Sequence, residues 1–317
     1  MLICAGHKHL YSENYSALWD FIETDMYPFT DPQTLRQHAY HDDEKLRVRH
    51  YIHEHFSVPR VDFPEWALQR LAWRGDEVVL DVGCGPGRYA EALTRLVPGA
   101  TYYGADFSAG MLLRHPQRDR TAQADIQRLP FPDGAFDMVM ANHMLYHVPD
   151  IPLALAECRR VLKPDGVFLA ATNSLDSMPQ FRELVKRAIL VLTAPGKAVQ
   201  LPLPPSHLFS LESGTRMLAR HFYAVVRYDL PGALVFDNVE PVMAYLETTR
   251  SLREPQLPEG VTWDSIMLIV REQVKNQLNY FGELVVNKLS GVLVASDRGG
   301  FISEFVQQGE QGRAPQG

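Results

Sequence analysis

The residues best suited to chemistry lie in a glycine-rich stretch, VVLDVGCGPG, at residues 78–87. Gly83, Gly85 and Gly87 permit a tight turn and let a ligand come close to the backbone. A helix that begins after the stretch would add free N–H groups and the positive end of its dipole. Position 88 is Arg, so the spacing is G-x-G-x-G and differs from the G-x-G-x-x-G of NAD and FAD sites. The stretch therefore predicts a ligand other than a dinucleotide.

Two further carboxylates follow predicted strands. Asp106 comes 19 residues after Gly87, at the end of a predicted strand over 101–104. A carboxylate at that point can accept hydrogen bonds from both hydroxyls of a ribose. Asp125 precedes the next apolar strand, where it could accept a bond from the amino group of an adenine, with Ile126 packed on the ring. The pattern is typical of a nucleoside site.

A parallel sheet would bring these residues to one edge. Residues 76–173 alternate between strand and helix, and such alternation indicates an α/β fold with helices on both faces of the sheet. Strands are expected at 78–80, 101–104, 137–141 and 167–171, and helices at 88–96 and 152–162.

The flanking regions differ in pattern. Residues 1–75 are expected to be helical and to precede any strand, with apolar residues at helical spacing from Tyr15 to Met26 and a helix start at Asp31-Pro32. Residues 174–317 are mixed, and 195–205 form a proline-rich loop. Further helices are expected at 181–192, 211–221, 239–250 and 262–281, a strand at 222–229, and a strand or hairpin at 283–295.

Four blocks in order carry a family resemblance: LDVGCGPG at 80–87, GADFSAGML at 104–112, ADIQRLPFPDGAFDMVMANHMLYHVPD at 124–150 and ECRRVLKPDGVFLAATN at 157–173. The chain resembles the class I S-adenosylmethionine (SAM) dependent methyltransferases. It looks closest to the methyltransferase type 11 branch, which is similar to the enzymes of ubiquinone and menaquinone biosynthesis. The resemblance implies a Rossmann-like sheet of seven strands, the last antiparallel, with added N-terminal helices and helical lid insertions. It divides the chain into an N-terminal helical cap (1–75), a SAM-binding core (76–175), and lid helices with the last strands (176–317).

The same resemblance implies the cofactor site. The three glycines would face the methionine part of SAM, Asp106 would hold the ribose with Phe107 beside the adenine, and Asn142 would lie under the sulfonium. Cys84 is expected to be a small packing side chain within the loop and not a nucleophile. The full expected set is Asp81, Gly83, Cys84, Gly85, Gly87, Asp106, Phe107, Met111, Asp125, Ile126 and Asn142.

Two histidines follow the expected strand 137–141 and are the candidate catalytic residues. A general base is needed only if the acceptor loses a proton during the transfer, and histidine suits that task. His143 and His147 would both lie near the transferred methyl group. For His147 we favour a local structural role in the turn, and for His143 both roles stay open.

The predicted activity is methyl transfer to O, N or C of a small molecule, such as a secondary metabolite or a quinone-like compound, with S-adenosylhomocysteine (SAH) as product. One alternative is a protein of this fold that transfers no methyl group, a cyclase or a binding or regulatory protein. A nucleic-acid methyltransferase is disfavoured, because the formal charge is −7 and Asn142-His143-Met144-Leu145 replaces the Asn/Asp-Pro-Pro-aromatic motif of amino-methylating enzymes.

Composition bounds the remaining properties. Seven of the 12 histidines lie in the first 55 residues. One helix cannot supply the ligand geometry that a metal needs, so no metal is expected, and His50, His53 and His55 indicate a solvated or lid-lining face.

Three scattered cysteines and the lack of an apolar run of about 18 residues predict a cytoplasmic protein that is not inserted into a membrane. A monomer or homodimer is expected.

Overall fold

The computed structural model describes residues 2–5, 27–194, 199 and 201–298. Within them, nine strands form one sheet in the order β1-β8-β9-β7-β6-β3-β4-β5, with β2 paired to β8. The strands are β1 (Leu2–Ala5), β2 (Ser57–Val58), β3 (Val78–Val82), β4 (Thr101–Asp106), β5 (Thr121–Gln123), β6 (Phe136–Asn142), β7 (Leu162–Asn173), β8 (Ala224–Phe236) and β9 (Leu284–Ser296).

The central seven strands confirm the predicted class I methyltransferase sheet. Strands β3 to β7 are parallel, and β9 runs antiparallel between β7 and β8. The expectation that helices precede any strand was wrong, because β1 and β2 both add to the edge strand β8. The predicted helix from Tyr15 to Met26 lies outside the described residues.

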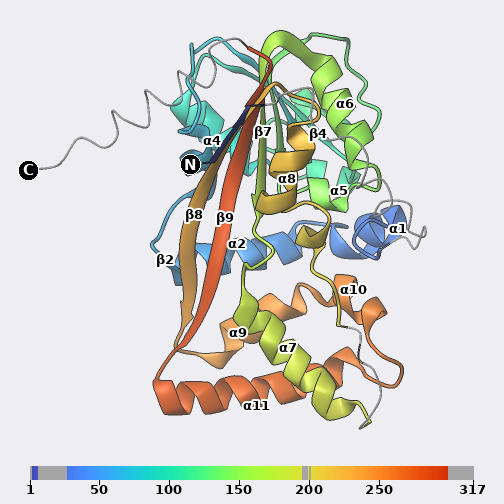
Figure 1. The fold of residues 1–317 in the computed structure, drawn as a ribbon, viewed down its shortest axis with the longest axis vertical. Coiled ribbons are helices and arrows are strands. Elements are labelled where there is room, and N and C mark those ends of the chain that lie inside the picture. The colour runs from blue at the N-terminus through green and yellow to red at the C-terminus, as the bar shows by residue number, and fades with distance from the viewer. Residues whose placement is uncertain (1, 6–26, 195–198, 200, 299–317) are drawn as a thin grey trace, which may run out of the picture.

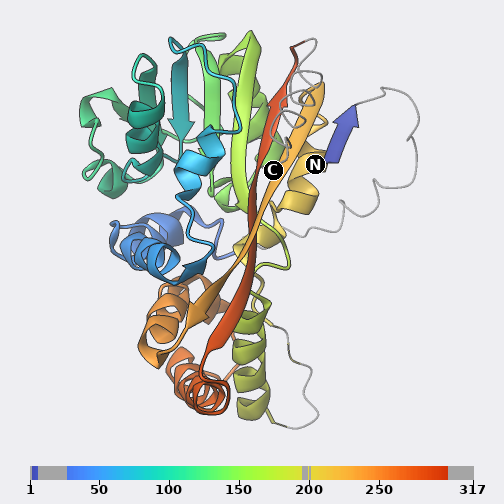
Figure 2. The same cartoon turned by 90° about the vertical axis from the view of Figure 1, so that its left-hand side faces the viewer.

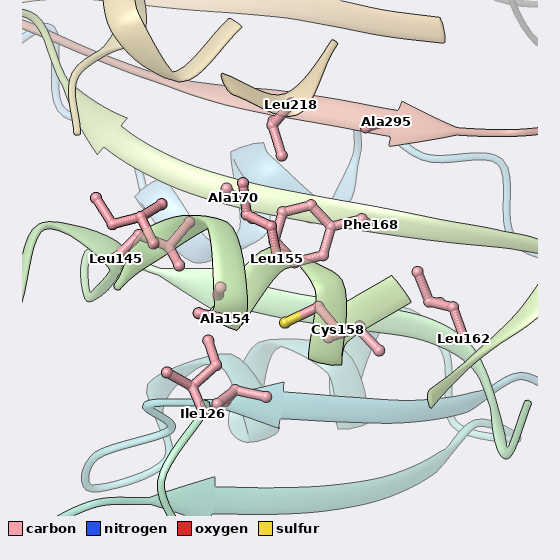
Figure 3. Packing of buried hydrophobic residues seen from close by; sticks show 14 of the residues in the cluster. Ile126, Leu145, Ala154, Leu155, Cys158, Leu162, Phe168, Ala170, Leu218 and Ala295 are labelled. Carbon is pink, nitrogen blue, oxygen red and sulfur yellow. The ribbon is translucent and has the colours of Figure 1, made fainter. Parts of the chain in front are cut away.

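Helices cover both faces of the sheet. On one face, α6 (Ile151–Val161) and α8 (Leu211–Leu218) pack against inward-facing residues of β3, β6 and β7. Figure 3 shows Leu155 and Cys158 of α6 against Phe168 of β7. On the other face lie α3 (Phe63–Leu68) and α4 (Arg88–Leu96). Successive side chains of each strand point to opposite faces of the sheet, so each strand packs against helices on both sides.

The last two long strands reach beyond this sheet. β8 and β9 have 13 residues each, so the predicted strand 222–229 is only the first part of β8, and residues 284–296 form one strand and not a hairpin. Figures 1 and 2 show both strands running from the main sheet into a lower group of helices. These are α7 (Pro179–Leu192), α9 (Val239–Glu247), α10 (Arg250–Arg253) and α11 (Trp263–Phe281).

The lower helices have a core of their own. Trp263 of α11 is fully buried, and its indole N–H donates to Glu247 at 2.9 Å. Phe181 of α7 and Phe236 of β8 pack in the same cluster. Ile52 of α2 (Glu44–Phe56) joins them, which fixes that helix between the lower helices and the main sheet.

The start of the N-terminal helical region is confirmed, but the helix is broken. Asp31 caps α1 (Pro32–Thr34) through a bond from Thr34 N to its carboxylate at 2.7 Å. A π-helical turn (Leu35–Ala39) follows, and the chain leaves helical geometry before α2 begins. Sequence patterns did not predict β5 or the short α5 (Ala109–Leu112), which are too brief to show a period.

Candidate functional site

A cavity of about 620 Å³ lies at the carboxyl ends of β3, β4 and β6, and residues of α1 and α2 form part of its wall. Ligands of open α/β sheets bind at this edge. The structure places eleven of the thirteen predicted site residues on its wall: Gly83, Cys84, Gly85, Asp106, Phe107, Met111, Asp125, Ile126, Asn142, His143 and His147. Asp81 and Gly87 do not line it.

The glycine loop is fixed at both ends. Gly83 N and Cys84 N donate to Ala105 O at 2.7 and 3.1 Å, which ties the loop to the end of β4. Gly85 has a φ of +53°, and a Cβ built there would point into open space on the cavity wall. Gly87 has a φ of +91°, and its Cβ would lie 2.8 Å from His115 Nε2. Gly85 thus leaves room for a ligand, whereas Gly87 is required by packing behind the loop.

Asp106 organises the end of β4. One carboxylate oxygen accepts from Gly85 N and the other from Ser108 N, both at 2.8 Å. Burial raises the pKa of this carboxyl above its usual range, against the lowering effect of those two bonds. Ser108 Oγ donates to Tyr40 O at 2.8 Å, so the same corner holds the N-terminal segment in place. The carboxylate stays on the cavity wall, where it can meet further donors.

The neighbouring aromatic and acidic residues form one end of the cavity. The guanidinium of Arg36 lies 3.7 Å from the centre of the Phe107 ring. Asp125 accepts from Gln127 N at 2.9 Å, which turns the chain so that Ile126 packs into the core beside it. These apolar surfaces next to acceptor oxygens suit a flat heterocycle with an amino group.

Asp81 is supported from behind by a chain of hydrogen bonds. His115 Nδ1 accepts from Gln117 N at 3.0 Å, so its Nε2 carries the proton and donates to Tyr102 Oη at 3.1 Å. Tyr102 then donates to Asp81 at 3.1 Å. Burial raises the pKa of Asp81 to about 7, and Tyr102 opposes that shift. Asp81 therefore acts beneath the glycine loop and not on the cavity wall.

Two residues on the wall have buried polar atoms that lack partners within the described residues, Asn142 and, at its hydroxyl, Tyr89; Asn142 is the one of the two at the end of β6. Asn142 is 8% exposed, and neither its Oδ1 nor its Nδ2 forms a hydrogen bond within the described residues. Its amide lies close enough to Asp81 to lower the pKa of that carboxyl, without the geometry of a hydrogen bond. Because an unpaired buried polar group is costly, a bound molecule is expected to complete it.

Comparisons with known proteins agree with this geometry. Residues 80–170 match the family model described as a methyltransferase domain. This part of the chain is similar to a methyltransferase domain. The matched residues span the glycine loop, Asp106 and Asn142.

Two curated relatives show how far the similarity extends. The malonyl-[acyl-carrier protein] O-methyltransferase of Legionella pneumophila is 36% identical over 112 residues, which is 33% of this chain and 38% of that protein. A demethylmenaquinone methyltransferase of Staphylococcus aureus is 37% identical over 126 residues, 37% of this chain and 52% of that one. The chain therefore spans about half the length, or less, of the curated relatives that it matches.

Solved structures extend the likeness of fold. A Haemonchus contortus phosphoethanolamine N-methyltransferase, in complex with SAH, covers 85% of this chain and 60% of its own, with a TM-score of 0.51 and 16% identity. A methyltransferase from an Anabaena variabilis antibiotic pathway covers 74% of this chain and 96% of its own, also at 0.51, with 13% identity. At these identities the likeness concerns the fold alone.

The two histidines after β6 of the methyltransferase domain have different surroundings. His147 Nδ1 donates to Phe29 O at 2.7 Å, so its Nε2 accepts the Tyr40 hydroxyl proton at 2.7 Å. Burial lowers the pKa of His147 to about 4. Both nitrogens are therefore occupied in the neutral ring, which suits a structural role.

His143 keeps its ring nitrogens free of partners within the described residues. Its φ is +53°, its backbone N donates to Ala171 O at 2.8 Å, and its ring lies 5.1 Å from that of Phe63. Burial lowers the pKa of this ring to about 4, so it is neutral at pH 7 and offers an unpaired acceptor nitrogen, although it is a weaker base than an exposed histidine.

The rest of the cavity wall was not predicted residue by residue. His50 and His53 of α2 line it, as the lid-lining interpretation expected, whereas His55 is exposed. Arg49, Tyr245 and Lys288 line it too, from α2, α9 and β9. No sequence pattern joins these three, because they meet only after β8 and β9 have paired.

Among the residues that the structure describes, no group of three or more His, Cys, Asp or Glu side chains could hold a metal ion. Over the same residues, no helix combines the length and hydropathy required to cross a membrane.

Proposed function

We propose that the protein transfers the methyl group of SAM to a small-molecule acceptor and releases SAH. The observation that carries the proposal is Asn142, a buried amide without partners on the wall of a cavity that also exposes Gly85 and Asp106. The methyltransferase domain over residues 80–170 supports it.

The residues present fit SAM. The open side of Gly85 leaves room for the methionine part, and Asp106 can accept from ribose hydroxyls. Phe107 and Ile126 offer apolar surfaces to an adenine, and Asp125 an acceptor for its amino group. When bound, SAM supplies a methyl group on a sulfonium that an acceptor atom displaces in line.

The protein's own residues would position SAM and the acceptor, exclude water from the cavity and accept a proton from the acceptor. The partnered His147 and Tyr40 hold the N-terminal segment over the cavity. The ring of His143 lies on the cavity wall, where its position would let it receive a proton from an O or N acceptor that must lose one. Catalysis would then rest on alignment in a dry site.

We place acceptor recognition in the cap (1–75) and in the lid with the last strands (176–317). Arg49 and His53 come from the first region and Tyr245 and Lys288 from the second, and all four line the same cavity as the cofactor residues. A cavity of about 620 Å³ is of the size that proteins use for small ligands. The curated relatives named for malonyl-[acyl-carrier protein] and demethylmenaquinone suggest first acceptors to screen.

Calorimetric titration with SAH tests the proposal, with Asn142→Ala as the variant and Asn276→Ala, at an exposed position of α11, as its matched control. Removal of the Asn142 amide should weaken SAH binding about tenfold or more, because polar atoms of the bound SAH would lose a hydrogen-bond partner. The control should bind like wild type. No SAH binding by wild type would contradict the proposal, and binding without turnover on any acceptor would favour a protein that transfers no methyl group.

A further inference from the structure

The charges on the cavity wall are not balanced by ion pairs among the described residues. Among the described residues, each acidic side chain on the wall already has a partner. The pairs are Glu54 with Arg88 at 2.9 Å, Asp62 with Arg95 at 3.6 Å, Asp106 with the amides of Gly85 and Ser108, and Asp125 with Gln127.

Among the described residues, four cations on the same wall have no carboxylate partner, Arg36, Arg49, Arg60 and Lys288; Arg36 and Arg60 are exposed, whereas Arg49 and Lys288 are partly buried. No carboxylate of the described residues lies within 4.0 Å of Arg49 or Lys288, although both line the cavity. Arg49 Nε donates to Lys45 O at 3.4 Å, and its guanidinium carbon lies 5.7 Å from the centre of the Tyr40 ring. Lys288 Nζ donates to Ser57 Oγ at 2.6 Å. Partly buried cations that face a cavity without counter-ions favour an anionic ligand.

His53 connects the two partly buried cations. Arg49 and His53 are four residues apart on α2 and therefore lie on one helical face. Lys288 Nζ is 3.5 Å from His53 Nδ1, and the His53 ring packs edge-on to Tyr245 at 5.8 Å. Burial, followed by the Lys288 charge, lowers the pKa of His53 to about 3, so this ring stays neutral between them.

Strand register places Lys288 on the acceptor side of the cavity. Asn142 pairs with Ala171 of β7, and Asn173, two residues further, pairs with Ser290 of β9. Lys288 is two more residues along β9, on the same face as Ser290 and roughly 7 Å beyond it. The lysine thus lies past the ends of β6 and β7, away from the glycine loop that faces the methionine part of SAM.

We propose that the methyl acceptor carries an oxyanion, a carboxylate or a phosphate, and that Arg49 and Lys288 bind it. This rests on the proposed function, since it assigns the second half of the same cavity. The guanidinium and the ammonium offer separate donors to one anionic group, while His53, Tyr146 and Tyr245 line the space around it. Lys288 is still largely charged near neutral pH, because burial lowers its pKa only to about 8.

The test titrates the full chain with inorganic phosphate, observed by 31P line broadening, and with benzoate, observed by proton saturation transfer. Benzamide is the uncharged counterpart of benzoate. Each titration is run without SAH and with saturating SAH, and SAH affinity is measured in parallel by calorimetry. The variants are Arg49→Gln, Lys288→Gln and the charge-retaining Arg49→Lys and Lys288→Arg. Arg60→Gln is the matched control, since Arg60 is a cation on the same wall that donates to His55 O.

Wild type should bind benzoate or phosphate, and not benzamide, and the stronger of the two anions identifies the acidic group. Each Gln variant should weaken that binding about tenfold, with SAH affinity within twofold of wild type. The charge-retaining variants should keep most of the binding, and Arg60→Gln should keep all of it.

Three results would overturn the inference: no anion binding by wild type, equal binding of benzamide, or anion binding that both Gln variants retain. Loss of SAH affinity in Arg49→Gln, with anion binding intact, would assign that arginine to the cofactor carboxylate and overturn it as well. If wild type binds the anions but not SAH, the proposed function fails while the oxyanion site stands.

Discussion

His143 and His147 stand four residues apart, yet only one of them has a ring that is free to react. The partners of His147 are Phe29 O and the Tyr40 hydroxyl, residues more than 100 positions away in the chain. The ring therefore joins the N-terminal segment to the end of β6. His143 is held by its backbone, in a left-handed conformation that turns its ring toward Phe63 and the cavity.

His147→Ala should reduce stability more than chemistry. The change leaves a buried carbonyl and a hydroxyl without partners, at a cost of about 1–3 kcal/mol. Thermal unfolding would show the loss as a lower Tm, and His207→Ala, at an exposed position, should leave Tm unchanged. A variant with the Tm of wild type and a greatly reduced kcat would contradict the structural role.

His143→Gln should have the opposite signature. For an acceptor that loses its proton, kcat should fall roughly hundredfold or more, because a positioned base contributes at least that much. SAH affinity should stay near that of wild type, since the ring is not among the predicted cofactor contacts. Single-turnover rates with calorimetry on the same samples would separate the two effects, and an unchanged kcat would remove His143 from the mechanism.

Among the elements, the turn from β3 to α4 fixes the site most directly. Gly85 and Gly134 both have positive φ, +53° and +63°, and a Cβ at either would meet no atom within 4 Å. They differ in one respect, since Gly85 is on the cavity wall and Gly134 is not.

Gly85→Ala should therefore weaken SAH binding, whereas Gly134→Ala should not. Both changes add backbone strain of about 1–2 kcal/mol, so their free energies of unfolding should fall by similar amounts. Only the alanine at 85 would place a methyl group in the space left for the methionine part of SAM. Equal SAH affinities in the two variants would mean that the ligand does not approach this turn.

The sequence predicts the elements around this turn well, because local signals define them. The glycines, the β-branched run of β3 and the apolar face of α4 place helix Arg88–Leu96 with its observed bounds. β5 has three residues and shows no period. Arg49 and Lys288 reach the same cavity wall only through the register of β8 and β9, which no local sequence pattern encodes. Asp81 was expected to contact the cofactor. In the structure it accepts a hydrogen bond from Tyr102, which is bonded in turn to His115, and residue spacing does not reveal these contacts.

At the scale of the whole molecule, the cavity lies where the main sheet and the lower helical core meet. β8 and β9 belong to both cores, and α2 packs on the second core while its other face lines the cavity. Four partly buried histidines lie in this junction. Burial lowers the pKa of His50 and of His53 to about 3, and that of His143 and of His147 to about 4.

The junction should therefore make the protein acid-sensitive. An unfolded histidine takes up a proton near pH 6.5, whereas these four stay neutral in the fold until about pH 3–4. Between those values the unfolded state binds more protons, so the free energy of unfolding falls as pH falls from 6.5 toward 4. Each histidine contributes up to about 1.4 kcal/mol per pH unit. Asp81 and Asp106 act in the opposite sense, because burial raises their pKa values, and so the total slope is smaller than four protons would give.

A single substitution isolates one histidine from this sum. His53→Gln keeps a polar side chain that cannot take up a proton, so its slope between pH 4.5 and 6.0 should be smaller than that of wild type by about one proton, or about 1.4 kcal/mol per pH unit. Urea unfolding at several pH values measures both slopes, and His207→Gln, at an exposed position, should leave the slope of wild type unchanged. Identical slopes in His53→Gln and wild type would mean that His53 is protonated in the folded protein. A charged His53 beside Lys288 would add a third cation to the acceptor end of the cavity, so the same measurement also bears on how much negative charge the acceptor must bring.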